Sequence, residues 1–134
     1  SRDRVNVLDE NVPEPEFRKV QQWRIRARWI GHDVGRGGML DREIISLLHS
    51  LPRPTFFALD GDFYKPTLRH SRYCLVWLNV DDKQAAEYIR RFLKHPQFNT
   101  IAKRHGHVIR VAPMEVHVWR PNADLEAVIP WSGR

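Results

Sequence analysis

Four aspartates stand where the expected strands end or the expected helices begin. Asp9 follows one apolar run, and Asp60 and Asp62 follow another, while Asp41 opens an amphipathic segment. In a mostly parallel sheet the carboxyl ends of the strands meet at one edge, so these side chains are expected to converge there. Carboxylates that crowd together repel one another unless a cation neutralises them, and their hard oxygens suit Mg²⁺ or Mn²⁺. The pattern predicts a divalent-metal site of the kind that can activate water for attack on a phosphodiester.

The same aspartates also have an ordinary structural interpretation. Asp41 suits the N-cap of the helix that it opens, although one carboxylate can cap a helix and bind a metal. The Asp60-Gly61-Asp62 sequence is typical of a turn. Asp9 is less easily explained, because its neighbours on both sides need no acid. Both interpretations stay open on the sequence alone.

The elements that must position these residues follow from the apolar pattern. Strands are expected over residues 4–8, 24–29, 55–59, 74–80, 107–111 and 115–120. Helices are expected to begin near residue 13, at residues 40–41 and at Asp81 or Asp82, with a short one over residues 97–105. The alternation of strands and helices predicts an α/β fold with a mostly parallel sheet and a C-terminal β-hairpin. Alternating arginines over residues 24–28 place that strand near a sheet edge.

Length and composition narrow the class of protein. The 134 residues, 42% of them hydrophobic, predict one domain over residues 1–134 with a single core. The formal net charge of +6 favours a polyanionic partner. Cys74, the one cysteine, lies in an apolar run, which is typical of a reducing, cytoplasmic location. No stretch is apolar and long enough to span a membrane, so no membrane partner is expected.

The segments around the aspartates resemble a known family. Residues 7–13 read VLDENVP, which looks like the LDENLP opening of small bacterial PIN-like domains, relatives of the Mut7-C domains. Residues 31–34 (GHDV), 41–44 (DREI) and 59–63 (LDGDF) resemble that family's GHDV, DEEI and xDxDF elements. They occur in the family's order, and the resemblance covers roughly residues 4–95.

The resemblance implies a PIN-like three-layer α/β/α sandwich and a ribonuclease that depends on Mg²⁺ or Mn²⁺. Carried over by motif, the catalytic and metal-binding residues are Asp9, Asp41, Asp60 and Asp62. RNA is then the expected partner. Some relatives act as toxins of toxin–antitoxin pairs, so the family also suggests an antitoxin partner and a homodimer. The chain departs from the family at Ala58, where a hydroxyl residue is usual, and a lost hydrogen bond there would weaken the site.

Basic residues follow the last of these motifs directly. Lys65, Arg69, His70 and Arg72 lie between two tyrosines. They could hold the phosphates of RNA while the tyrosines stack on its bases. A solvated basic loop explains the same residues equally well.

Two further functions stay open. A PIN-like module without catalytic activity could bind RNA or a protein, which Ala58 and the basic loop favour. A phospho-acceptor receiver-like domain would also place acids after its first strand, at Asp9 and Glu10, and after its third, at Asp60. The receiver is the weaker interpretation, because no lysine ends a suitable late strand and Asp41 and Asp62 would be unexplained.

Overall fold

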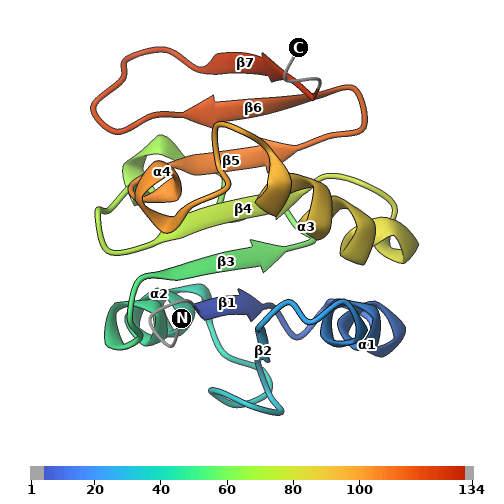
Figure 1. Cartoon of the computed structure of the whole chain (residues 1–134). Coiled ribbons are helices and arrows are strands. Elements are labelled where there is room, and N and C mark those ends of the chain that lie inside the picture. Colours follow the sequence, from blue (N-terminus) through green and yellow to red (C-terminus); the bar gives the residue numbers. More distant parts are fainter. Residues whose placement is uncertain (1–4, 132–134) are drawn as a thin grey trace.

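The computed structural model describes residues 5–131, and a seven-stranded β-sheet lies at its centre (Figure 1). The strand order across the sheet is β2-β1-β3-β4-β5-β6-β7. The strands are β1 (Val5–Leu8), β2 (Arg28–Trp29), β3 (Pro54–Ala58), β4 (Cys74–Leu78), β5 (Val108–Val111), β6 (Glu115–Trp119) and β7 (Ala127–Pro130). β1 to β5 pair in parallel, whereas β6 and β7 are antiparallel to their neighbours. The predicted α/β class with a mostly parallel sheet is confirmed.

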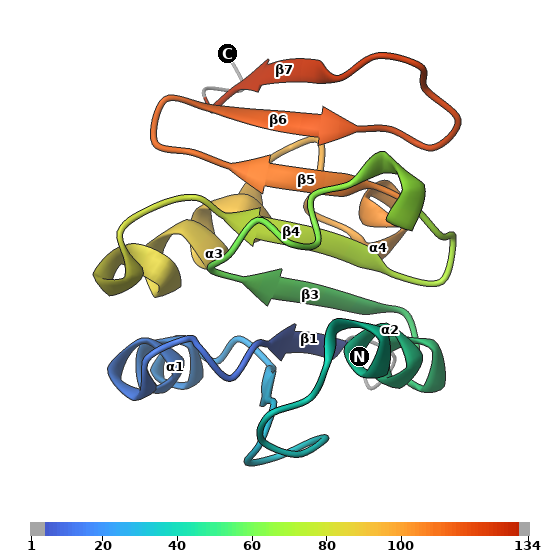
Figure 2. The same cartoon turned by 180° about the vertical axis from the view of Figure 1, so that it is seen from behind.

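Helices cover both faces of the sheet. They are α1 (Glu14–Gln22), α2 (Asp41–Ser50), α3 (Ala85–Lys94), α4 (Ile101–Arg104) and the 3₁₀ helices η1 (Pro66–Leu68) and η2 (Asp82–Gln84). Figures 1 and 2 show α3 and α4 over one face and α2 over the opposite face, and α1 packs against α3. Within the described part of the chain, no helix is both long enough and apolar enough to cross a bilayer.

The core lies in two layers, because successive side chains of a strand point to opposite faces of the sheet. Phe57 belongs to the cluster under α1 and α3, where its ring meets that of Phe92 edge to face with centroids 5.9 Å apart. Its neighbour Phe56 belongs to the cluster under α2, together with Ile44 and Leu48. Edge-to-face contact is a favoured arrangement of aromatic rings. The continuous apolar runs of β3 and β4 thus supply both layers.

β2 is shorter than the predicted strand over residues 24–29. Arg24 takes a left-handed φ of 61°, and the backbone N–H of Ile25 donates to the Val20 carbonyl at 3.1 Å. These residues therefore close the end of α1 before the chain extends, and only Arg28–Trp29 pairs with β1. The predicted position of this strand at a sheet edge is confirmed.

The C-terminal part also differs from the predicted elements. Of residues 97–105, only Ile101–Arg104 is helical, because Thr100 starts the helix by accepting a hydrogen bond from the backbone N–H of Lys103 at 3.2 Å. β5 and β6 pair antiparallel, and β7 adds a strand beyond them that the sequence did not predict. β7 carries a weak signal, since only Ile129 in it is buried and Pro130 ends it.

The buried ring of Phe57 gives a test of this packing. Phe57→Ala leaves a cavity between β3 and α3, so we expect the free energy of unfolding to fall by about 3–5 kcal/mol in chemical denaturation. Val128→Ala is the control, because Val128 is 54% exposed; its effect should stay within about 0.5 kcal/mol. Similar losses in the two variants would contradict the arrangement of the core.

Candidate functional site

Asp9 ends the first parallel strand at the edge of the sheet where all five parallel strands finish, which we call the carboxyl edge. Its backbone N–H continues the ladder by donating to the Phe57 carbonyl at 2.9 Å. The side chain is 7% exposed, and Oδ1 accepts a hydrogen bond from the backbone N–H of Glu10 at 2.9 Å. Parallel pairing with β3 therefore holds a largely buried carboxylate at this edge.

Asp60 and Asp62 lie in the turn that follows β3 at the same edge. Asp60 accepts two hydrogen bonds, at Oδ1 from the backbone N–H of Asp62 (3.0 Å) and at Oδ2 from the Asn11 side chain (3.1 Å). The first bond is ordinary turn chemistry, as the sequence allowed. The second ties the loop after β1 to the loop after β3. Gly61 packs so closely on the Trp77 indole that a Cβ there would lie 3.1 Å from the ring.

Asp41 is the first helical residue of α2 and is not its N-cap, so the predicted capping role is wrong. Leu40 takes the cap position with an extended backbone, and Glu43 accepts a hydrogen bond from the Leu40 N–H at 2.8 Å. An acid in the first turn still interacts favourably with the helix dipole. The carboxylate of Asp41 is thus not used as a cap.

Glu10 and the glycine-rich loop add a contact that the sequence analysis did not find. Glu10 Oε1 accepts a hydrogen bond from the backbone N–H of Gly38 at 2.8 Å, which draws residues 31–38 over the carboxyl edge. Arg36 pairs with Glu43 across the same region at 2.6 Å. The position of Glu10 directly after Asp9 was the signal available in the sequence.

The GHDV segment has a structural role. His32 stacks on Trp29 with ring centroids 3.8 Å apart, and Trp29 stacks on Phe17 at 5.0 Å. Asp33 accepts a hydrogen bond from the backbone N–H of Trp29 at 3.1 Å. These contacts fix the loop that leaves β2 against Phe17 of α1.

The acids of this edge act on one another electrostatically. Burial and the charges of Asp60, Glu10 and Asp41 together raise the pKa of Asp9 from 3.8 to about 6, and burial is the largest of these effects. The hydrogen bond from the Glu10 N–H opposes them. A buried carboxyl whose ionisation is opposed by like charges is typical of functional sites.

The donor set suits a hard divalent cation, but these side chains do not form a closed ligand shell. Among residues 5–131, no three His, Cys, Asp or Glu side chains are grouped as metal ligands. Both oxygens of Asp60 accept hydrogen bonds from protein groups. The fold thus brings Asp9, Asp41, Asp60 and Asp62 to one edge, as topology predicts, without assembling them around a common point.

The residues predicted to hold phosphates are not gathered beside the aspartates. Lys65 is exposed just before η1. Arg69 donates to three backbone carbonyls, those of Pro66, Arg120 and Ala123. His70 and Arg72 come shortly before β4, at the opposite edge of the sheet, where the parallel strands begin. We call this the amino edge.

Comparisons of the chain with known protein families, with curated proteins and with solved structures find no match. The fold and the acidic edge define a class, an α/β domain with a mostly parallel sheet and carboxylates after its strands. The functional interpretation below is argued from the residues and their geometry.

The pKa of Asp9 predicts how stability depends on pH. It is higher in the folded state than in an unfolded chain, so the contribution of this group is present at acid pH and lost as pH rises through about 6. Asp9→Asn, which removes the charge but keeps an acceptor, should raise the free energy of unfolding by about 1–2 kcal/mol at neutral pH. The gain should vanish below about pH 4. Denaturant unfolding across this pH range measures it, and a loss of stability at neutral pH would contradict the account.

Proposed function

We propose that the chain is a PIN-like, divalent-metal-dependent ribonuclease whose centre is Asp9 at the carboxyl edge. The observation that carries the proposal is geometric: a largely buried carboxylate follows β1, an inner parallel strand, beside a second acidic turn, and Asn11 joins the two loops. Ligands of open α/β sheets bind at this edge. Three of the four motifs that resemble PIN-like domains contain these acids, namely those at residues 7–13, 41–44 and 59–63.

The roles that we assign to the acids come from the motif resemblance and from the positions of these residues after the strands. Asp9 and Asp60 would be the principal ligands of Mg²⁺ or Mn²⁺, with Asp41 and Asp62 completing or orienting the shell. The ion would lower the pKa of bound water and neutralise charge on the scissile phosphate. Before any ion arrives, the chain's own contribution is to hold Asp9 in a partly desolvated place, where a carboxylate interacts strongly with a cation.

A specific observation favours a second candidate, a PIN-like module that binds RNA or a protein without cleaving it. The carboxylate of Asp60 accepts hydrogen bonds at both oxygens, and β3 ends in buried Ala58 where the family usually has a hydroxyl. The two candidates differ in one property, the ability of the carboxyl edge to take up a metal ion.

Calorimetric titration with Mn²⁺ separates them. We expect saturable binding by the metal-free protein, and its loss in the double variant Asp9→Asn/Asp60→Asn, because both principal ligands lose their charge. Cleavage of RNA should fall by about 100-fold or more in the same variant. The matched control is Asp82→Asn/Asp124→Asn, which removes the same charge from two exposed positions.

The titration and the cleavage assay distinguish the two candidate functions. Binding that persists in Asp9→Asn/Asp60→Asn would place the ion elsewhere and overturn the assignment. Binding that is absent from the unmodified protein would support the module without catalytic activity. Cleavage that survives loss of the metal would show that the reaction does not use this edge.

A further inference from the structure

The charges of the fold are separated along the strand direction. Acids follow the strands or occupy the first turns of the helices, as at Glu14 and Glu16, Asp41 and Glu43, and Asp82 and Glu87. Basic residues occupy the last turns of α2, α3 and α4. Each arrangement complements the helix dipole. Since α2 and α3 begin after parallel strands, the carboxyl edge becomes acidic and the amino edge becomes basic.

Two adjoining depressions at the amino edge concentrate this positive charge. One is lined by Arg53, Arg72, Ser71, His105 and Pro52. The other shares Ser71 and His105 and adds Arg69, His70, Asn122 and neighbouring residues. No Asp or Glu is among the described residues that line either one. We call the set Arg53, Arg69, His70, Arg72 and His105 the amino-edge basic surface.

The side chains of this surface come from separate parts of the chain. Arg53, between α2 and β3, donates from Nε to His105 Nε2 at 3.3 Å. Arg72, before β4, donates to the His49 carbonyl at 3.3 Å. Arg53, His70 and Arg72 are all exposed. Arginines from two separate loops thus lie together, which a single solvated basic loop does not explain.

The electrostatic balance of the surface is positive. Burial lowers the pKa of His105 below its ordinary value, and the charges of Arg53 and Arg104 lower it further. Among residues 5–131, Asp124 and Glu126 lie at this edge in the segment between β6 and β7, and Glu126 is engaged by Tyr64 and His117. The arginines are therefore not neutralised by carboxylates of the surface itself.

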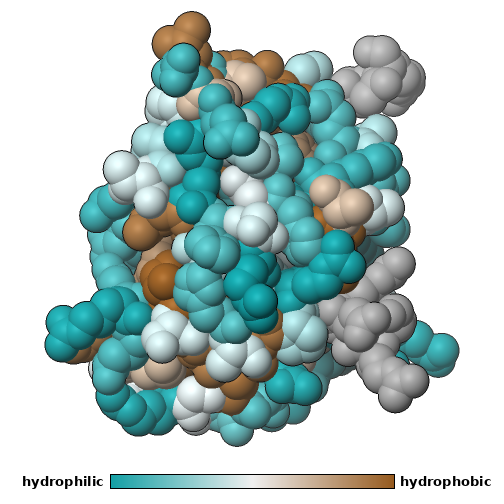
Figure 3. Space-filling model, turned by 90° about the vertical axis from the view of Figure 1, so that its left-hand side faces the viewer, coloured by the Kyte–Doolittle hydropathy of each residue, from teal (hydrophilic) through white to brown (hydrophobic). Residues whose placement is uncertain are grey.

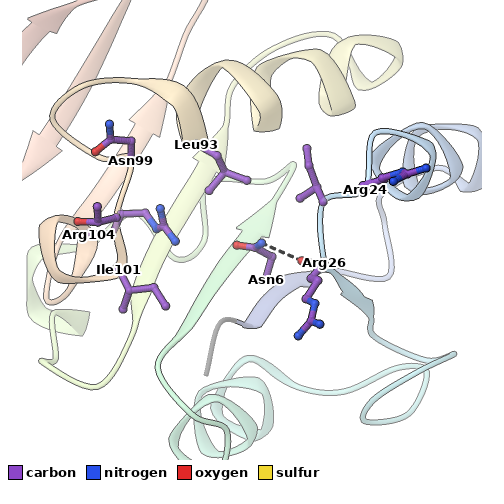
Figure 4. Close-up of a pocket in the computed structure, with 9 residues that line it drawn as sticks. Asn6, Arg24, Arg26, Leu93, Asn99, Ile101 and Arg104 are labelled. Atoms are coloured by element: carbon purple, nitrogen blue, oxygen red, sulfur yellow. Dashed lines mark hydrogen bonds between the residues drawn. The ribbon is translucent and has the colours of Figure 1, made fainter. Parts of the chain in front are cut away.

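A third depression has several of its polar groups engaged within the protein (Figure 4). It is lined by Asn6, Arg24, Arg26 and Arg104, among others. Buried Arg104 donates to the Thr55 hydroxyl at 3.0 Å and to the Phe98 carbonyl at 2.7 Å, and Asn6 donates to the Arg26 carbonyl at 2.8 Å. The Arg104 bonds tie α4 to β3 and to the segment after α3, and the Asn6 bond ties β1 to the segment before β2.

The chemistry of the surface suits a nucleic acid better than a protein. Protein interfaces have an apolar centre, whereas nucleic-acid interfaces are polar and strongly positive. Figure 3, which views the amino edge, shows a predominantly hydrophilic face. The exposed large apolar residues of the described chain, which are Leu40, Met114, Leu125 and Val128, do not line the two depressions.

We propose that the amino-edge basic surface binds the phosphodiester backbone of a nucleic acid, with Arg53 and Arg72 contacting phosphates. This surface lies at the amino edge, whereas Asp9 lies at the carboxyl edge. Binding there would not involve hydrolysis, so the proposal goes beyond the proposed function. Arg69 positions the surface through its three carbonyl contacts. The exposed ring of His70, which stacks on Tyr73 with centroids 5.6 Å apart, lies beside the phosphate contacts.

Binding measured in EDTA tests this proposal independently of any metal or cleavage. Fluorescence anisotropy with labelled oligo(U) and oligo(dT) over a range of salt gives affinity and salt dependence. Arg53→Gln/Arg72→Gln should weaken both oligonucleotides roughly tenfold and make the log–log salt slope shallower by about 1.4, the value for two lost phosphate contacts on a single strand. Arg53→Lys/Arg72→Lys keeps both charges and should retain the slope.

The matched control is Arg18→Gln/Lys83→Gln, which removes the same net charge from exposed positions outside this surface. It should leave the slope unchanged, and unfolding curves should show all variants folded. If the control variant lost as much affinity for the oligonucleotides, net charge alone would explain the effect, and the proposal would be overturned. Equal binding of polyglutamate at matched charge would also overturn it, by showing that any acidic polymer is accepted. Tighter binding of oligo(U) than of oligo(dT) would show that the surface prefers RNA to DNA.

Discussion

Parallel hydrogen bonding among β1 to β5 forces every loop that follows one of these strands to the same edge of the sheet, and every loop that precedes one to the other edge. The loops that carry Asp9 and Asp60 meet because β1 and β3 are neighbours with Leu8 opposite Phe57. The cations of Arg53 and Arg72 meet at the far edge for the same reason. A shift in this register would separate both groups.

The burial of Asp9 lowers the stability of the fold when the side chain is ionised, because a buried charge is poorly solvated. The ladder bond to Phe57 and the packing around β1 hold the carboxylate in place, and solvation is lost as a result. A site that is strained in this way can gain free energy from a ligand that neutralises it, and proteins often carry such a cost where they function. At the amino edge, by contrast, Arg53 and Arg72 remain exposed, so their charges stay hydrated and cost the fold little.

Strong periodic signals made most of the fold predictable from sequence. The runs that became β3 and β4 and the amphipathic pattern of α2 left little ambiguity. The sequence could also place Asp9, Asp41, Asp60 and Asp62 at one edge, since this needs only the parallel topology. It could not predict that Leu40 and not Asp41 occupies the cap, or that Asn11 would bond Asp60, because these depend on backbone angles and side-chain contacts. β7 was missed because its apolar run is only four residues long and ends in a proline, which predicts no particular element.

The pairing of Val5 with Pro54 has a consequence for the order of folding. β5, β6 and β7 follow one another along the chain and pair through short connections, so they can form from local contacts. β1 must instead wait until a long segment has closed, and loop closure of this kind slows folding. We therefore expect the carboxylate that follows β1 to meet Asp60 late in folding, after other apolar strands have begun to pack. On this account, the carboxylates of the carboxyl edge repel one another only after the packed strands can hold them together.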